Sequence, residues 1–227
     1  MSLMRGICAV IPVKDRTQAK QRLAGTLSPL QRRQFALAML EDVLATLTAV
    51  PELAGILVVT VDAEASRLAA RLGARVRQAG ARDGHTGAVA AAADLLAAEG
   101  LGMMAVPADI PLVLPQDIRD VLAAHGSAPA FTIVPARDDR GSNAVLCSPA
   151  DVVPLRFGDD SFFPHLAAAR ARGIAPLVVR KPRIGLDLDS PDDLALFMET
   201  PSPTHSYALL QRWGMTGVAD QLGTMAG

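Results

Sequence analysis

Short, nearly continuous apolar runs alternate with longer amphipathic segments along this chain. The run from Gly6 to Val13 (GICAVIPV) carries no charge, which is typical of a strand buried on both faces of a parallel sheet. Ser28, Pro29 and Gln31 then form a helix start signal, with a cap, a proline at the first helical position and a capping-box partner. This alternation predicts an α/β fold with helices on both faces of a mainly parallel sheet.

The same pattern continues towards the C-terminus. Further strands are predicted over residues 56–61, 74–77, 103–106, 131–134, 144–147 and 177–180. Further helices are predicted over residues 62–72, 86–99, 115–124, 161–172 and 191–198. We expect one domain over residues 4–199 and a partly ordered tail over 200–227, with a turn of helix near Tyr207 to Trp213.

Composition excludes several classes of protein. With 227 residues, 50% hydrophobic and 20% charged, the chain needs no disulfides to build a core. The net charge of -1 gives no footprint for nucleic acid, and no apolar run approaches the roughly 20 residues of a membrane span. Cys8 and Cys147 lie in apolar runs and are interpreted as buried hydrophobes of a cytoplasmic protein. The histidines have no zinc-ligand spacing.

Two carboxylates lie two residues apart in segment 185–191 (GLDLDSP), where we expect a strand to run into a helix. Side chains at i and i+2 of a strand point to the same side. Asp187 and Asp189 would then repel each other unless a proton or cation lies between them. Mg²⁺, which prefers oxygen ligands and bridges to phosphates, is the natural occupant. The alternative is that Asp189 is a surface charge and Ser190 a helix cap.

Ligands of parallel α/β sheets bind beyond the carboxyl ends of the strands. There, residues 12–23 contain four cations, Lys14, Arg16, Lys20 and Arg22. Lysine point charges and arginine forks suit a polyphosphate, whereas a solvated loop is the alternative. The loop has neither G-x-G-x-x-G nor G-x-x-x-x-G-K-[ST], which argues against a dinucleotide site and against a P-loop.

Asp109 follows another buried strand, between prolines that fix the backbone around it. It is either a turn former or, with Asp187 and Asp189, an oxygen ligand of one or two Mg²⁺ ions that carry phosphates. In both cases it belongs to the edge of the sheet where ligands bind.

Residues 156–163 (RFGDDSFF) lead into a helix, and the N–H groups of a helix N-terminus bind anions. Ser161 adds a hydroxyl there, unless it is an ordinary N-cap. Residues 141–143 (GSN) offer a second patch of backbone donors.

Taken in order over residues 7–197, these segments resemble the CofC/FbiD family, nucleotidyltransferases that activate a phospho-acid with GTP during biosynthesis of coenzyme F-420. The matching stretches are 11–14 (IPVK), 19–24 (AKQRLA), 107–111 (PADIP), 141–144 (GSNA), 156–158 (RFG), 161–162 (SF) and 186–194 (LDLDSPDDL). The resemblance implies a single-domain, Rossmann-like (GT-A-like) three-layer sandwich related to molybdenum-cofactor guanylyltransferases. It also implies a homodimer.

The strand-end residues and the resemblance together predict roles for individual side chains. The predicted nucleotide-binding residues are Pro12, Val13, Lys14, Lys20, Gly84, His85, Thr86 and Asp109. The predicted catalytic residues are Lys14, Lys20, Arg22 and Asp109. Mg²⁺ is predicted at Asp109, Asp187 and Asp189, and the phospho-acid at Ser142, Asn143, Gly158 and Ser161.

The expected reaction is attack by a phosphate oxygen of a small phosphorylated carboxylic acid on the α-phosphorus of GTP, with release of pyrophosphate. The acid is 2-phospho-L-lactate, phosphoenolpyruvate or 3-phosphoglycerate. The family's Gly-Leu-Asn-x-Ala-Leu run is replaced here by residues 84–89 (GHTGAV), which leaves the identity of the base open.

Two alternatives remain open. The first is a related nucleotidyltransferase that acts on molybdopterin or a sugar phosphate. Such enzymes usually carry a glycine-rich loop after the first strand, and residues 14–23 contain no glycine. The second is a non-catalytic module that binds a nucleotide without releasing pyrophosphate.

Overall fold

The computed structural model describes residues 6–14 and 20–215. Within these ranges the strands are β1 (Ile7–Pro12), β2 (Leu53–Val59), β3 (Arg75–Arg77), β4 (Gly102–Ala105), β5 (Ala130–Pro135), β6 (Ser142–Ser148) and β7 (Leu177–Val178). They form one sheet in the order β3-β2-β1-β4-β6-β5-β7. Only β6 runs antiparallel to its neighbours β4 and β5. The predicted mainly parallel sheet is confirmed.

The helices of the described residues are α1 (Pro29–Thr48), α2 (Ala63–Arg71), α3 (Gly84–Ala98), α4 (Pro115–Ala124), α5 (Phe162–Ala171), α6 (Pro182–Gly185), α7 (Pro191–Met198) and α8 (His205–Arg212), with a short 3-10 helix, η2 (Gln21–Leu23). Apart from the strand expected just before residue 191, each predicted strand and helix is present, with shifted ends. For example, β2 begins at Leu53 rather than Ile56, because Leu53 and Gly55 already pair with Ile7 and Cys8 of β1.

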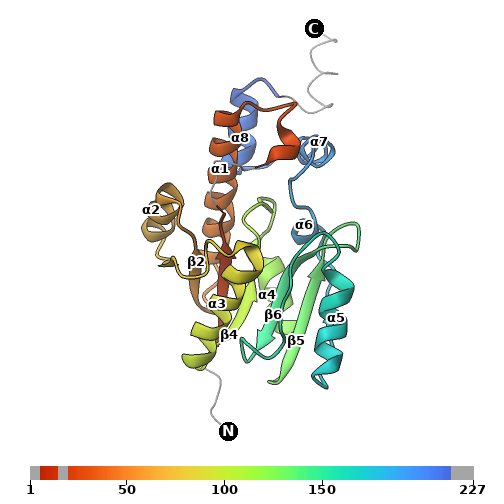
Figure 1. Cartoon of the computed structure of the whole chain (residues 1–227). Coiled ribbons are helices and arrows are strands. Elements are labelled where there is room, and N and C mark those ends of the chain that lie inside the picture. The colour runs from red at the N-terminus through yellow and green to blue at the C-terminus, as the bar shows by residue number, and fades with distance from the viewer. Residues whose placement is uncertain (1–5, 15–19, 216–227) are drawn as a thin grey trace.

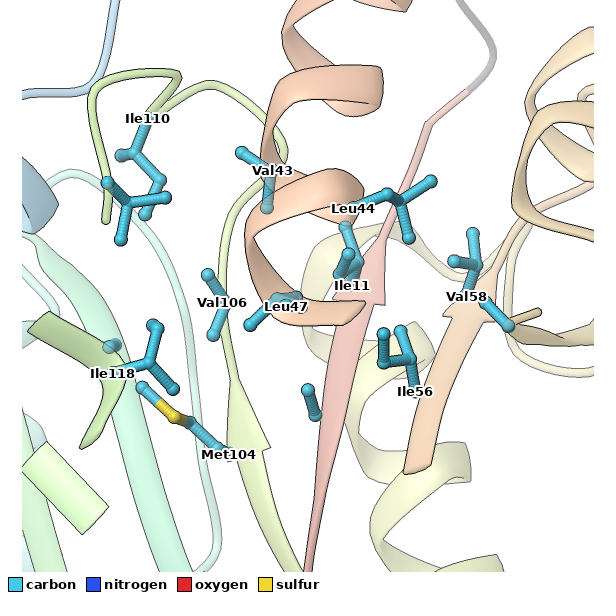
Figure 2. Packing of buried hydrophobic residues seen from close by; sticks show 14 of the residues in the cluster. Ile11, Val43, Leu44, Leu47, Ile56, Val58, Met104, Val106, Ile110 and Ile118 are labelled. Carbon is cyan, nitrogen blue, oxygen red and sulfur yellow. The ribbon is translucent and has the colours of Figure 1, made fainter. Parts of the chain in front are cut away.

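Helices cover both faces of the sheet, as expected of a three-layer sandwich (Figure 1). On one face α1, α2 and α4 pack against the strands, and Figure 2 shows Leu44 of α1 beside Ile11 and Val58. On the opposite face α3 packs on β1, β2 and β4, and α5 packs on β5 and β6. The apolar strand residues are therefore buried from both sides, which explains why their sequences read as continuous apolar runs.

Local sequence signals place the helix starts. Gln31 N–H donates to Ser28 Oγ at 3.3 Å, and Ser28 N–H donates to Gln31 Oε1 at 2.9 Å, so the predicted capping box is confirmed. Asp62 caps α2 by accepting from two backbone N–H groups. Ser190 and Asp193 form a second capping box at the start of α7. These contacts satisfy N–H groups that a helix leaves unpaired.

The prediction that a strand runs into the helix at residue 191 is wrong. The helix α6 ends at Gly185, and the residues between α6 and α7 belong to no strand. Leu188 N–H instead donates to the carbonyl of Asp109 at 3.0 Å, in the loop after β4. Leu186 and Leu188 are buried in a cluster with residues of α1, α7 and α8, so the chain leaves the sheet to fill that cluster.

The C-terminal helix α8 lies against α1 (Figure 1). The buried Asp42 of α1 accepts hydrogen bonds from His205 N–H at 2.7 Å, Ser206 N–H at 3.0 Å and Ser206 Oγ at 2.6 Å. The helical turn predicted near Tyr207 to Trp213 is found here, as α8. Residues 216–227 lie outside the described residues, and the division into a domain over 4–199 and a tail stays a prediction.

Both cysteines are buried and free, as expected. Burial raises the pKa of the Cys8 thiol to about 11 and the pKa of the Cys147 thiol to about 12. Among the described helices, none combines the length and the apolarity that crossing a membrane requires.

We predict that Asp42→Ala lowers the free energy of unfolding by roughly 1–3 kcal/mol, because it removes a cap and leaves buried donors unpaired. Urea denaturation followed by circular dichroism measures the change. Asp94→Ala, on the exposed face of α3, is the control and should change stability by less than about 0.5 kcal/mol. An equal effect of the two substitutions would contradict the capping role.

Candidate active site

One cleft of about 1220 Å³ opens at the edge of the sheet where β1 and β4 end and β6 begins. Single ligand pockets usually measure roughly 300–1,000 Å³, so the cleft has room for a nucleotide and a small second molecule. It is lined by all the predicted site residues, namely Pro12, Val13, Lys14, Lys20, Arg22, Gly84, His85, Thr86, Asp109, Ser142, Asn143, Gly158, Ser161, Asp187 and Asp189. Their individual roles stay predictions.

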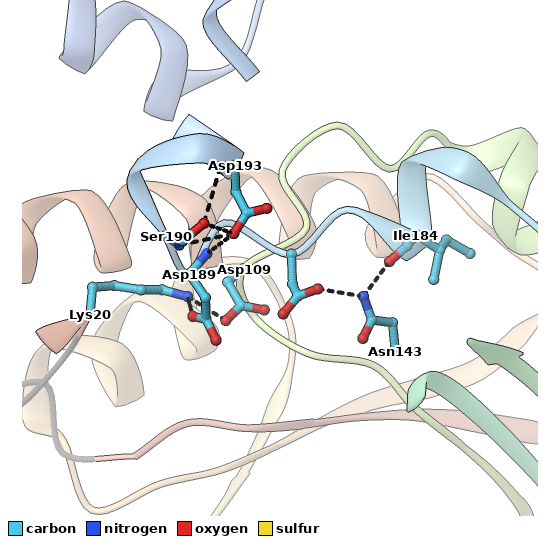
Figure 3. A network of polar contacts seen from close by, with 8 residues as sticks. Lys20, Asp109, Asn143, Ile184, Asp189, Ser190 and Asp193 are labelled. Carbon is cyan, nitrogen blue, oxygen red and sulfur yellow. Dashed lines mark hydrogen bonds and ion pairs between the residues drawn. The ribbon is translucent and has the colours of Figure 1, made fainter. Parts of the chain in front are cut away.

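An ammonium group bridges two of the predicted carboxylates. Lys20 Nζ donates to Asp109 Oδ2 and to Asp189 Oδ1, at 2.5 Å in both cases (Figure 3). The side chain of Lys20 is only 8% exposed. Burial lowers the pKa of Lys20, but the two carboxylates outweigh this effect and raise it overall. Lys20 is therefore a fixed positive charge at neutral pH.

The third carboxylate is held from another direction. Asn143 Nδ2 donates to Asp187 Oδ1 and to the carbonyl of Ile184, both at 2.9 Å. Burial, followed by the negative charge of Asp109, raises the pKa of Asp187 despite the hydrogen bond from Asn143. The sequence pattern did not reveal that Asn143 positions Asp187. Its predicted contact with the phospho-acid stays a prediction.

The carboxylates suit a hard cation in two respects. Asp109 Oδ1 is buried and has no hydrogen-bond partner among the described residues. Burial and the nearby charge of Asp109 raise the pKa of Asp187, and a cation beside it would favour its charged form. The described part of the chain contains no ready-made group of three metal-binding side chains, and Lys20 lies between Asp109 and Asp189. Substrate oxygens would therefore have to complete the coordination of a metal ion, as is usual for Mg²⁺.

Two further cations lie near this cluster. Burial would raise the pKa of Asp189, but the charge and hydrogen bond of Lys20 and the charges of Arg22 and Lys14 lower it. Lys14 and Arg22 are exposed, so they are accessible to a ligand in the cleft. Arg16, the remaining cation predicted in this loop, lies outside the described residues.

On the side of β6, three polar side chains form a chain of hydrogen bonds. Ser161 Oγ donates to Ser142 Oγ at 3.1 Å, and His165 Nδ1 lies 2.9 Å from the same oxygen. The side chain of Ser161 makes no capping bond to α5, which decides against an ordinary N-cap. The sequence pattern did not reveal that His165, one turn beyond Ser161, joins this network. Its spacing of four residues from Ser161 was the available signal.

The start of α3 is tied to the loop before α5. Gly84 adopts a positive φ of 74°, a conformation that favours glycine. His85 then packs on Phe157 with ring centroids 4.4 Å apart, and Thr86 Oγ1 accepts from Phe157 N–H at 3.0 Å. Burial lowers the pKa of His85 to about 4. The stretch that departs from the family pattern thus joins two walls of the cleft.

The sequence profile of one protein family, described as guanylyl transferase CofC like, matches residues 7–223. The chain belongs to this family. Its relatives include a phosphoenolpyruvate guanylyltransferase from Rubrobacter xylanophilus, which is 38% identical over 83% of this chain and 92% of its own length. A 2-phospho-L-lactate guanylyltransferase from Methanothermobacter thermautotrophicus is 35% identical over 92% of both chains. A 3-phospho-D-glycerate guanylyltransferase from Colwellia psychrerythraea is 32% identical over 86% of this chain and 92% of its own length.

Solved structures support the fold of this CofC-like chain. A nucleotide-diphospho-sugar transferase structure from Desulfovibrio desulfuricans superimposes with a TM-score of 0.70 at 20% identity, covering 91% of this chain and 94% of the other. A nucleotidyl transferase from Methanothermobacter thermautotrophicus gives 0.60 at 18% identity, covering 85% and 96%. The predicted nucleotidyltransferase fold is confirmed.

The buried histidines of the CofC-like cleft should make folding stability fall in acid. Burial is the main cause that lowers the pKa of His165 to about 4, against 6.5 in an unfolded chain. Between these two values the unfolded state binds more protons, so stability is greatest above pH 6.5 and is lost as the pH falls towards 4. His165, at 1% exposure, accounts for up to about 3 kcal/mol.

Urea denaturation at pH 7.5 and pH 5 tests this prediction. His165→Asn should reduce the loss of stability between these pH values. The control His205→Gln changes an exposed histidine and should retain the loss. An unchanged pH dependence in His165→Asn would contradict the prediction.

Proposed function

We propose that this chain transfers GMP from GTP to a small phosphorylated carboxylic acid and releases pyrophosphate, as a step of coenzyme F-420 biosynthesis. The observation that carries the proposal is the composition of this cleft. It contains a buried ammonium between carboxylates and, where β6 and α5 begin, a hydrogen-bonded pair of serine hydroxyls. The relatives named for phosphoenolpyruvate, 2-phospho-L-lactate and 3-phosphoglycerate support it.

The chemistry suits such side chains. A phosphate oxygen is already an anion, so its attack on the α-phosphorus needs alignment and charge neutralisation more than proton transfer. Lys20 offers a positive charge whose position two carboxylates fix, which avoids reorganisation during the reaction. Lys14 and Arg22, exposed near the same cluster, would stabilise the leaving pyrophosphate.

Mg²⁺, when bound, supplies further neutralisation of phosphate charge. Asp109, Asp187 and Asp189 are the residues that would hold it. Asn143 keeps Asp187 oriented for this task through the hydrogen bond at 2.9 Å.

The homodimer implied by the resemblance belongs to the same proposal. Measuring the molecular mass of the protein in solution tests it.

A pyrophosphate-release assay that crosses GTP, ATP, CTP and UTP with the three phospho-acids tests the proposed function. We expect release with GTP and at least one of these acids in the presence of Mg²⁺. Release with molybdopterin or a sugar phosphate in place of the acid would favour the related nucleotidyltransferases. GTP binding without any release would favour a non-catalytic module.

We predict that Asp187→Asn lowers kcat at least about 100-fold, because it removes negative charge that fixes the electrostatics of the cleft. Its melting temperature should stay close to that of the wild type, since Asn can still accept from Asn143. Asp151→Asn, an exposed position outside the cleft, is the matched control. Full activity of Asp187→Asn would refute the assignment of Asp187 to the site.

A further inference from the structure

The hydrogen bonds around His165 determine which ring nitrogen carries the proton. Arg156 N–H donates to His165 Nε2 at 2.9 Å, so Nε2 is an acceptor and has no hydrogen. Burial keeps the imidazole neutral at pH 7 by lowering its pKa to about 4. A neutral imidazole has one N–H. The hydrogen is therefore on Nδ1, which donates to Ser142 Oγ at 2.9 Å.

The hydroxyl of Ser142 can consequently only donate one further hydrogen bond. Its oxygen accepts from His165 Nδ1 and from Ser161 Oγ, and a hydroxyl oxygen has two acceptor lone pairs. No acceptor among residues 6–14 and 20–215 receives the hydrogen of Ser142. Because Ser142 lines the cleft, this hydrogen is available to a ligand there.

We propose that His165 is a positioning residue that fixes the Ser142 hydroxyl as a hydrogen-bond donor and so makes this part of the cleft select an anionic, acceptor-only oxygen of the substrate acid. This inference rests on the proposed function and adds the rule by which the acid is chosen. A carboxylate or phosphate oxygen can accept a hydrogen bond from Ser142. Such a hydrogen bond is stronger when the acceptor is charged. An amide or ammonium N–H in the same place would meet the hydrogen of Ser142 with its own, and a neutral hydroxyl oxygen would accept it more weakly than an anionic oxygen.

The ring of His165 is well placed to hold this arrangement. His165 is 1% exposed, and Phe157 packs edge-on against its ring with the centroids 5.0 Å apart. The backbone N–H of His165 donates to the carbonyl of Ser161 at 3.0 Å, at the start of α5. Rotation of the ring to exchange its nitrogens would break both side-chain hydrogen bonds, which is costly for a buried group.

Nitrogen-15 NMR of the full chain labelled at histidine tests the proton position without any turnover. We expect one histidine with a protonated Nδ1 and an unprotonated Nε2 at pH 7, and its signals should be absent in His165→Gln. Protonation of Nε2 at His165 would overturn the inference, whether or not the enzyme is active.

Two substitutions separate the two hydrogen bonds of His165. In His165→Asn the side-chain amide can replace Nδ1–H and still donate to Ser142. In His165→Gln the amide oxygen can replace Nε2 and still accept from Arg156 N–H, but Ser142 loses its donor. Without that donor, the Ser142 hydroxyl is no longer fixed to donate to the charged acid. We therefore expect His165→Gln to raise the KM for the acid about tenfold more than His165→Asn does. The KM for GTP should differ by less than about twofold between the two variants.

A double-mutant cycle completes the test. If His165 acts through Ser142, His165→Gln should add little to the effect of Ser142→Ala on the KM for the acid. Additive effects, or equal effects of the Gln and Asn variants, would overturn the inference. Absence of turnover in the wild type with every acid would instead overturn the proposed function, and the acid selectivity with it.

Discussion

The ammonium of Lys20 between Asp109 and Asp189 is the interaction on which the cleft depends (Figure 3). It joins three parts of the chain that are far apart in sequence, namely the loop after β1, the loop after β4 and the segment before α7. Burying a charge is expensive unless a partner compensates it. Lys20 is therefore the group on which this cluster depends most, because its loss would leave both carboxylates without their shared cation.

Apolar packing supports this charged cluster from behind. Leu186 and Leu188 are buried with residues of α1, α7 and α8, while Asp187 and Asp189, which alternate with them, line the cleft. The hydrogen bond from Leu188 N–H to the carbonyl of Asp109 fixes the two carboxylate segments relative to each other. The helix α8, anchored by Asp42, thus supports the cleft without lining it.

Where β6 and α5 begin, the hydrogen-bond network is made of neutral groups. His165, Ser142 and Ser161 form a hydrogen-bond chain whose direction follows from one backbone N–H at Arg156. The rings of His85, Phe157 and His165 pack in succession, and the first two line the cleft. The walls predicted to hold the nucleotide and the acid are therefore in physical contact, although the residues that form them lie about 70 positions apart in the chain.

The sequence by itself determined the α/β architecture, because the apolar period and the caps are local signals that each segment carries alone. It also determined that the predicted site residues share one edge of the sheet, since ligand-binding loops follow parallel strands. Only the tertiary structure decided that Lys20 bridges Asp109 and Asp189, and that residues 186–189 form a loop rather than a strand. These facts depend on which distant side chain fills a given space, and no local pattern records that.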